Sequence, residues 1–345
     1  MDRRGRKLLT AGVLTAGVAL GGWLNARQIE RASARRRARA DRGRPVEVAG
    51  AAGNRLHVRV HGPEDAPTLV LVHCWTGTSE LWHKQVDALA GELRIVTYDH
   101  RGHGLSEDAP DGDYSLEALA ADLDAVIRAT VPAGERPLLA GHSMGAMTIA
   151  AWAAANSGRV AERALGAALC STGLEGLTEQ SAVFTALPGP FATLRGSLTG
   201  AALEAPVSIK GTPLPLFRRA VHLLALGPDA APQDVELTAR MTLDCRARAR
   251  AGCGRAMVRM NLFHATKELN VPTVVVAGRL DRMTPLRHAE RIEAALPRSL
   301  GLRVDERAGH MTPLEAPDLV NAALRELAAA ALGTGGERPQ QAAAA

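Results

Sequence analysis

Aromatic side chains are scarce in this chain of 345 residues, which contains only four Trp, four Phe and two Tyr. With 46% hydrophobic residues the chain still has enough apolar side chains for a sizeable core, which excludes global disorder. Such a core must consist mostly of Ala, Leu and Val, and we expect any ligand pocket to be aliphatic. A chain of this length can form one large α/β domain or two smaller ones.

Cysteines are also few, and no two of them form a CxxC pattern or cluster with histidines at metal-ligand spacing. The count excludes a disulfide scaffold, and the spacing argues against a structural zinc site. We therefore expect neither a metal nor a cofactor, and we expect free, buried thiols. Pairing of Cys245 with Cys253 in an oxidising compartment is the alternative. The four cysteines are Cys74, Cys170, Cys245 and Cys253.

Basic residues are not in excess over most of the chain, although the net charge is +5. Residues 1–44 contain 12 of the 41 Lys and Arg residues but only 3 of the 36 Asp and Glu residues. The remainder, with 29 basic and 33 acidic residues, is mildly acidic. A uniformly basic nucleic-acid-binding protein is therefore disfavoured, and we expect no nucleic-acid partner.

The amino terminus contains the one long uncharged run, from Leu8 to Leu24, directly after four basic residues. A helix of these 17 residues would be about 25 Å long, the lower limit for crossing a bilayer. This layout is typical of a signal peptide or a signal anchor. We expect residues 1–44 to bind the membrane, with sidedness left open. Secretion after cleavage, for which Ala32–Ala34 is the candidate site, is the alternative.

From Pro45 onward, strand-like segments alternate with helix-like segments, which predicts a mostly parallel sheet with helices on both faces. The first two predicted strands form a hairpin. The predicted strands are Val46–Ala49, Leu56–Val60, Thr68–His73, Arg94–Tyr98, Pro137–Ala140, Leu165–Cys170, Thr273–Ala277 and Leu302–Asp305. The predicted helices are Ser79–Ala90, Ser115–Ala129, Gly145–Asn156, Pro285–Ala295 and Pro313–Leu332.

The alternation breaks between Thr172 and Lys267, a segment that contains seven prolines. Helical stretches are predicted near Leu216–Leu226 and Val235–Arg250, so the segment resembles a mainly helical insertion into the α/β domain of residues 45–332. Residues 240–259 carry six Arg and one acid, which fits either a solvated helix face or a site for an anion or a membrane. The tail at 333–345 is predicted to be disordered.

The sharpest motif is Gly-His-Ser-Met-Gly at 141–145, between the strand PLLA and the apolar helix AMTIAAWAAA. A nucleophile elbow needs this context: a strand, a tight turn with small residues beside the serine, and a helix whose N-terminus lies below the hydroxyl. The alternative is an ordinary glycine-rich turn with an idle serine. The context favours Ser143 as a nucleophile.

A serine hydroxyl needs a base to accept its proton, and the base needs an acid to orient it. In this architecture the acid and then the histidine follow the serine, on loops after later strands. Asp281 follows the strand TVVVA, and His310 follows the strand near Leu302–Asp305. We predict Asp281 and His310 in these roles, with Asp305 as the alternative acid.

The tetrahedral intermediate of such a reaction carries an oxyanion that needs preorganised N–H donors. One donor is expected from the amide of Met144, directly after the nucleophile. The other is expected from the loop at 73–77, where the amide of Trp75 is preferred.

These motifs resemble the α/β-hydrolase fold family, in its lidded, serine-nucleophile branch. The matching segments, which occur in the expected order between Pro45 and Leu332, are HCWTG at 73–77, YDHRGHGLS at 98–106, GHSMG at 141–145, GRLDRMTP at 278–285 and GHMTPLEAP at 309–317. The resemblance implies that residues 172–267 are a lid over the pocket and that the DHRGHGLS loop supports the site. It also argues against epoxide hydrolase and dehalogenase chemistry, which use Asp in place of Ser143.

Two positions depart from the family pattern. Cys74 replaces the usual glycine of the oxyanion loop, which either narrows the pocket mouth or places a thiol near the site. Ala146 replaces a glycine that often follows the GHSMG motif, a mild change in helix packing.

We expect a serine hydrolase of the carboxylesterase or lipase type, acting on a small-molecule ester with an aliphatic acyl group. Three alternatives keep the triad: amide hydrolysis, carbon–carbon bond hydrolysis, and cofactor-free perhydrolysis like that of haloperoxidases. A fourth alternative, from another class, is a non-catalytic binding protein that retains the fold.

Overall fold

The computed structural model describes residues 43–177, 209 and 214–333, so the apolar run at 8–24, the tail at 334–345 and part of the predicted insertion lie outside the described residues. One eight-stranded sheet organises the chain, in the order β1-β2-β4-β3-β5-β6-β7-β8. The pairs β1–β2 and β2–β4 are antiparallel, and the other five neighbouring pairs are parallel. The strands are β1 (Arg44–Ala49), β2 (Arg55–His61), β3 (Thr68–Val72), β4 (Arg94–Tyr98), β5 (Leu138–His142), β6 (Gly166–Cys170), β7 (Thr273–Gly278) and β8 (Ser299–Asp305).

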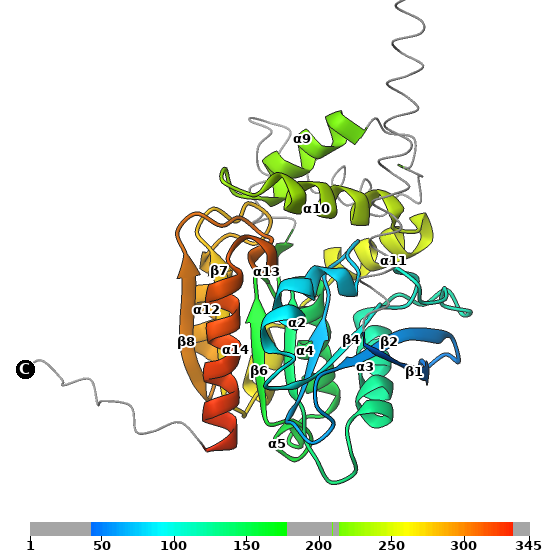
Figure 1. The fold of residues 1–345 in the computed structure, drawn as a ribbon, viewed down its shortest axis with the longest axis vertical. Coiled ribbons are helices and arrows are strands. Elements are labelled where there is room, and N and C mark those ends of the chain that lie inside the picture. The colour runs from blue at the N-terminus through cyan, green and yellow to red at the C-terminus, as the bar shows by residue number, and fades with distance from the viewer. Residues whose placement is uncertain (1–42, 178–208, 210–213, 334–345) are drawn as a thin grey trace, which may run out of the picture. The chain divides into compact units, whose positions relative to one another are not determined.

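Helices cover both faces of the sheet, as the alternating pattern predicted (Figure 1). One face carries α2 (His83–Leu89), preceded by the 3₁₀ turn η1 (Ser79–Trp82), and α14 (Pro317–Leu332), preceded by α13 (Thr312–Glu315). The other face carries α3 (Leu116–Thr130), α4 (Met144–Ala155), α12 (Arg287–Ala295) and the 3₁₀ segment η2 (Phe263–Glu268). The short α5 (Val160–Arg163) precedes β6.

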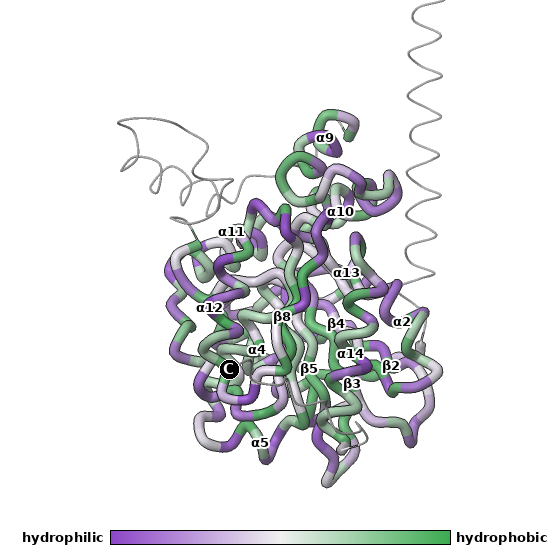
Figure 2. Tube along the Cα trace, turned by 90° about the vertical axis from the view of Figure 1, so that its left-hand side faces the viewer, coloured by the Kyte–Doolittle hydropathy of each residue, from purple (hydrophilic) through white to green (hydrophobic). Residues whose placement is uncertain are grey.

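Two hydrophobic cores follow from the alternation of side chains along the central strands. In β3, Val70 and Val72 join the core under α3, α4 and α12, whereas Leu69 and Leu71 join the core under α2 and α14. All four are fully buried. Figure 2 shows the same arrangement as hydrophobic strands between more hydrophilic outer segments. Because both faces are covered, these strands are continuous apolar runs rather than alternating ones.

Two predicted helices are broken. The helix predicted from Pro313 to Leu332 ends at Glu315 and restarts at Pro317, because Pro317 has no N–H and keeps Ala316 out of the helical region (φ −127°, ψ 56°). The stretch predicted near 235–250 divides at Cys245 and Arg246, which both have extended ψ angles of 130° and 135°. The guanidinium of Arg246 donates to the carbonyl of Ser106 (2.7 Å), which ties this break to the domain below.

The described part of the segment between β6 and β7 is mainly helical. Three of its helices lie above the carboxyl ends of the parallel strands (Figure 1), and we call them the lid helices: α9 (Leu214–Ala225), α10 (Pro232–Asp244) and α11 (Ala247–Val258). A single isolated bridge, between Glu175 and Asn261, is the β-pairing found within the described part of this segment. Within the ranges that the structure describes, no helix has the length and apolarity needed to cross a membrane.

Candidate active site

Ser143 sits at a strained turn between β5 and α4. Its backbone angles (φ 53°, ψ −117°) lie in a region that side-chain-bearing residues rarely adopt, and such strain clusters at functional sites. The flanking glycines allow the turn, because a Cβ on Gly141 would lie 2.5 Å from the amide nitrogen of Ala146 and one on Gly145 would lie 2.1 Å from the carbonyl oxygen of Val72. This geometry matches the elbow predicted from the GHSMG motif.

The three residues predicted as a triad are hydrogen-bonded in series. The hydroxyl of Ser143 lies 2.9 Å from Nε2 of His310, and Nδ1 of His310 lies 2.8 Å from Oδ2 of Asp281. All three residues are buried. The Asp281 contact fixes the tautomer of His310, with the proton on Nδ1, so that Nε2 can accept from Ser143.

Asp281 is held as an ionised acceptor by its own loop. Its Oδ1 accepts the amides of Met283 and Thr284, both at 2.8 Å, and its Oδ2 accepts the hydroxyl of Thr284 at 2.8 Å. Burial acts to raise the pKa of this carboxyl, but the nearby His310 and the hydrogen bonds from His310 and Thr284 outweigh burial, so the pKa lies below its ordinary value.

Asp305, the alternative acid, does not reach His310. Its Oδ1 accepts the amides of Arg307 (2.9 Å) and Ala308 (2.7 Å), and so it closes the turn after β8. The alternative assignment was therefore wrong, because the side chain folds back onto its own loop.

Both predicted oxyanion donors are close to Ser143. Trp75 lines the same pocket, and Met144 directly follows Ser143 in the chain. Met144 is the first residue of α4, where an amide has no carbonyl of a preceding turn to bind. Trp75 lies in a four-residue turn that the amide of Gly77 closes onto the carbonyl of Cys74 (3.0 Å). We call residues 74–77 the oxyanion turn.

The loop that carries His310 is held by a residue that the sequence reasoning missed. The carboxylate of Glu315 accepts the amides of Gly309 (3.1 Å) and Met311 (2.9 Å) on both sides of the histidine, and also that of Gly227 (2.5 Å) just beyond α9. Burial raises the pKa of this carboxyl, although the three amides oppose the shift. The sequence feature that could have predicted this role is an acidic residue five positions after the histidine, in the GHMTPLE segment.

At this loop, stretches of backbone approach one another so closely that no side chain fits between them. A Cβ on Gly278 would lie 2.1 Å from the carbonyl oxygen of Gly309, and a Cβ on Gly309 would lie 2.6 Å from the amide nitrogen of Gly227. A Cβ on Gly227 would in turn lie 2.1 Å from the carbonyl oxygen of Arg307. The amide of His310 donates to the carbonyl of Ala225 at the end of α9 (2.9 Å), so the lid and the histidine loop are joined through backbone.

Buried histidines connect the DHRGHGLS loop to the oxyanion turn. His73 binds the carbonyl of Cys74 through Nδ1 (2.7 Å) and accepts the amide of His100 at Nε2 (2.9 Å). Burial lowers the pKa of His73 and of His100, and it lowers the pKa of His103 to about 3. As a result, these three rings are neutral. The rings therefore act as hydrogen-bonding spacers beneath the site, in agreement with a supporting role for this loop.

His142, inside the elbow motif, is a further buried neutral ring. Its Nε2 lies 2.7 Å from the carbonyl oxygen of His310 and donates to it. Burial, followed by the effect of His310, lowers the pKa of His142 to about 3. The histidine loop is therefore held from below by β5 and from above by the lid.

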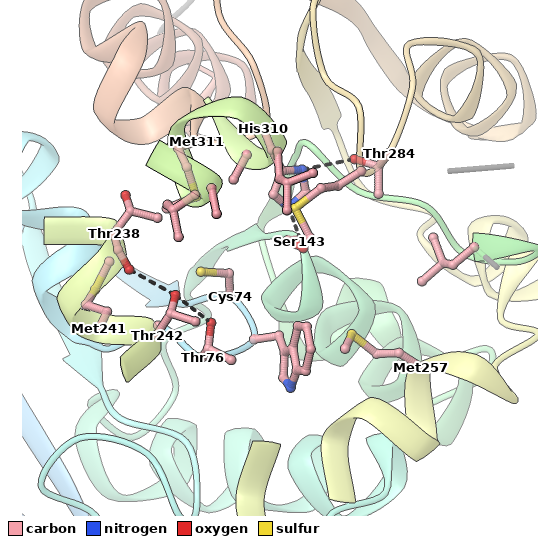
Figure 3. A pocket seen from close by; sticks show the side chains of 18 of the residues that line it. Cys74, Thr76, Ser143, Thr238, Met241, Thr242, Met257, Thr284, His310 and Met311 are labelled. Carbon is pink, nitrogen blue, oxygen red and sulfur yellow. Dashed lines mark hydrogen bonds between the residues drawn. The ribbon is translucent and has the colours of Figure 1, made fainter. Parts of the chain in front are cut away.

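An apolar pocket of about 260 Å³ opens onto Ser143 and His310 (Figure 3). Its wall includes five of the eight methionines of the chain and side chains from all three lid helices. The polar wall groups besides Ser143 and His310 are threonine hydroxyls. The lining residues are Cys74–Gly77, Ser143, Met147, Leu177, Phe217, Ala220, Val221, Leu224, Ala225, Thr238, Met241, Thr242, Met257, Val258, Met283, Thr284, His310 and Met311.

Cys74 does border this pocket, as its replacement of a family glycine suggested. Burial raises the pKa of its thiol to about 12, so the group is a protonated, apolar part of the wall and not a second nucleophile. All four cysteines are free and buried, as predicted, and the alternative pairing of Cys245 with Cys253 is not formed.

The six arginines at 240–259 do not form one solvated face. Arg250 is buried, Arg240 pairs with Glu236, and Arg246 lies against the domain below, whereas the remaining three are exposed. The single-face interpretation was wrong because the helix break at 245–246 turns two parts of the stretch in different directions. Among the described residues no group of three or more His, Cys, Asp or Glu side chains could hold a metal ion.

Comparison with known proteins defines the class. The model of the family with the alpha/beta hydrolase fold matches residues 67–317, so the chain belongs to the α/β-hydrolase fold family, which confirms the resemblance seen in the sequence. A solved esterase from Thermogutta terrifontis has a TM-score of 0.67 at 23% identity, over 84% of this chain and 99% of that one. A bacterial membrane phospholipase A has a TM-score of 0.69 at 20% identity, over 95% and 99% of the two chains.

Sequence similarity to a curated protein is more local. The "Putative carbamate hydrolase RutD" of Variovorax paradoxus is 37% identical over 94 residues, which are 27% of this chain and 34% of the relative. The chain thus matches about a third of the length of this relative.

Proposed function

We propose that this protein is a serine hydrolase that cleaves a small-molecule ester through an acyl-enzyme on Ser143. The observation that carries the proposal is the hydrogen-bonded series from Ser143 through His310 to Asp281 (2.9 and 2.8 Å) at the base of an apolar pocket. A binding protein would have no use for a strained serine in contact with an oriented base. The family and the esterases that share its fold support the same class.

In the proposed reaction, Nε2 of His310 accepts the proton of Ser143 as Oγ attacks the substrate carbonyl. Asp281 stabilises the imidazolium, and the amides of Trp75 and Met144 donate to the oxyanion. Collapse of the tetrahedral intermediate breaks the ester bond, and His310 gives its proton to the departing alcohol. Water, deprotonated by His310, then releases the acid and restores Ser143.

The pocket supports an aliphatic acyl group of modest size. Its volume of about 260 Å³ is just below the usual range of about 300–1,000 Å³ for ligand pockets, and about half of its lining residues are Met, Leu, Val and Ala. Because methionine side chains adapt to the shape of a ligand, we expect the pocket to accept acyl chains of different shapes but not of widely different lengths.

Carbamate hydrolysis is a second candidate, supported by the local similarity to RutD. Amide hydrolysis, carbon–carbon bond hydrolysis and perhydrolysis use the same Ser143, His310 and Asp281 arrangement and are separated by substrate alone. An ester and a carbamate with the same leaving alcohol and the same number of heavy atoms should be compared. An ester preference supports the first candidate, and a carbamate preference supports the second.

A fluorophosphonate probe tests the shared part of these candidates. We expect the full-length protein to be labelled on Ser143, and the Ser143→Ala variant not to be labelled. Ser157→Ala, which removes an exposed serine just after α4, is the matched control and should label like the wild type. Folded wild-type protein that resists labelling would instead support a non-catalytic binding protein.

We also propose that residues 8–24 attach the protein to a membrane, which the apolar run and its basic flanks support. Full-length protein should sediment with membranes after lysis. The Val13→Glu/Val18→Glu variant places two charges in the run and should move the protein to the soluble fraction. An unchanged distribution would contradict the proposal and leave the hydrolase assignment untouched.

A further inference from the structure

The oxyanion turn has a backbone that its own sequence does not favour. Thr76 has a φ of 57°, and β-branched residues avoid positive φ because the side chain crowds the backbone. Trp75 and Thr76 are the central pair of a turn that usually has glycine or asparagine at its second central position. Contacts from elsewhere must therefore hold this turn in place.

Each of the two central residues is held by a different lid helix. The indole Nε1 of Trp75 donates to the carbonyl of Arg250 on α11 (3.0 Å). The hydroxyl of Thr76 lies 3.3 Å from that of Thr242 on α10, and Figure 3 shows the two side chains facing each other.

The direction of the second bond follows from counting protons. Thr242 has one hydroxyl proton, which it donates to the carbonyl of Thr238 one turn earlier in α10 (2.9 Å). Its oxygen is therefore the acceptor for Thr76. Both residues of the turn thus donate to the lid, one to each helix.

The lid helices are themselves tied to the domain below them. At the start of α10, the buried carboxylate of Asp234 pairs with the partly buried Lys84 of α2 (2.8 Å). At the junction of α10 and α11, Arg246 donates to the carbonyl of Ser106 (2.7 Å). The lid is a fixed support for the turn rather than a loose cover.

We propose that the lid helices complete the oxyanion site: through Thr242 and the Arg250 carbonyl, α10 and α11 position the amide of Trp75. Thr242 is then a positioning residue, and the indole of Trp75 has a positioning role separate from that of its amide. The inference rests on the proposed acyl-enzyme chemistry. It makes the lid part of the catalytic geometry as well as a wall of the acyl pocket.

Three variants test the inference in the full-length protein. Thr242→Val removes the acceptor with nearly the same shape, Trp75→Phe removes the indole donor but keeps the amide, and Thr242→Ser restores the hydroxyl. Loss of a whole oxyanion donor lowers kcat by about 10²- to 10³-fold, so a displaced donor should cost about tenfold. We expect this fall in kcat for the first two variants, little change in KM, and near wild-type rates for Thr242→Ser.

An inhibitor pair separates positioning from ground-state binding. The hydroxyl oxygen of Ser143 adds to the carbonyl of a trifluoromethyl ketone and forms a tetrahedral oxyanion. The matching methyl ketone binds in the pocket mostly without this addition. In Thr242→Val the inhibition constant of the first should rise by about the same factor as kcat falls, because both need the same donor. That of the second should stay within about twofold.

Thr130→Val is the control for removal of a helical threonine hydroxyl, since Thr130 also bonds the carbonyl four residues before it and lies on α3, away from the pocket. A rise in KM at unchanged kcat would overturn the inference, as would equal losses in Thr242→Val and Thr242→Ser. Failure of the underlying chemistry is recognised separately, because the wild-type protein would then not react with fluorophosphonate.

Discussion

The floor and the roof of the pocket are built on different principles. The floor, from the loops after β3, β5, β7 and β8, contains nearly all of the polar geometry: Ser143, Asp281 and His310 have fixed partners at 2.8–2.9 Å. The roof, from α9, α10 and α11, contributes thioether, aliphatic and phenyl groups, with hydroxyls as its polar atoms.

The difference separates the hydrogen-bonded series of the floor from most of the pocket wall, and of the described roof residues only Thr242 and the Arg250 carbonyl bond to the oxyanion turn. In the floor, backbone crossings leave no space for a single extra carbon, so each group has one position. In the roof no such crossing is found among the described pocket-lining residues, and its two methionines, Met241 and Met257, accept several shapes at small cost. Changes to the floor should therefore abolish function or folding, whereas changes to roof residues that only line the pocket should alter substrate preference.

The largest effect is expected for Asp281→Asn. The amide cannot accept the Nδ1 proton and the Thr284 hydroxyl as the carboxylate does, so His310 loses its orientation and its counter-charge. We expect kcat to fall by about 10⁴-fold with an unchanged fold. Initial rates on an activated ester and a circular dichroism spectrum provide the test. A loss below about tenfold would mean that the floor tolerates change as the roof does.

The second effect concerns pH and the buried histidines of the floor. Their ordinary pKa is 6.5, and burial lowers the values for His103 and His142 to about 3. Between these pH values the unfolded chain binds protons that the native chain does not, so the free energy of unfolding falls as pH falls. Each ring contributes a slope of about 1.4 kcal/mol per pH unit. Urea titrations from pH 7 to pH 4 should show this slope, and His103→Gln should reduce it; an identical slope would contradict the prediction.

The third effect concerns close packing at the elbow. Gly145→Ala would place a Cβ 2.1 Å from the carbonyl oxygen of Val72, so α4 must move away from β3. We expect a loss of about 2–3 kcal/mol in stability and a large loss of labelling at Ser143. Gly91→Ala, where nothing lies within 4 Å, should change the melting temperature little. Equal melting temperatures for the two variants would show that Gly145 is packed no more tightly than Gly91.

The smallest effect is expected in the roof. Met241→Ala enlarges the pocket beside α10 and should shift the preferred acyl chain towards longer chains, with a change of about tenfold in relative kcat/KM. Rates of labelling by a small fluorophosphonate should change by less than about threefold, because the floor is intact. Met260→Ala removes a buried methionine outside the pocket wall and should leave the chain-length profile as it is. A profile that does not move in Met241→Ala would show that the roof does not select the acyl chain.

Much of the floor could be predicted from sequence because its parts are local. The serine motif adjoins the strand and the helix that shape it, and Asp281 and His310 each follow a strand of the same parallel sheet. Since the carboxyl ends of parallel strands share one edge, strand order alone brings these residues together. The structure places them within hydrogen-bonding distance of one another.

The roof could not be predicted in the same way. The bond from Trp75 to Arg250 joins positions 175 residues apart, and no local pattern encodes it. The break at Cys245 and Arg246 has no proline or glycine to announce it, because a long-range contact of Arg246 stabilises it. Asp305, which was only the alternative to Asp281, has a suitable position at the end of a strand, but a local turn uses its side chain.

The junction of three backbones at Gly227, Gly278 and Gly309 has a consequence for recombination of this scaffold. A foreign helical cap can carry any residues along its pocket side, yet between α9 and α10 it has to present a glycine at 227, against the Arg307 carbonyl and the Gly309 amide. Chimeras whose foreign segment ends within α9, upstream of Ala225, keep that junction native. Chimeras whose foreign segment continues past 227 replace the junction. They should lose the native position of the histidine loop as well as the old substrate specificity.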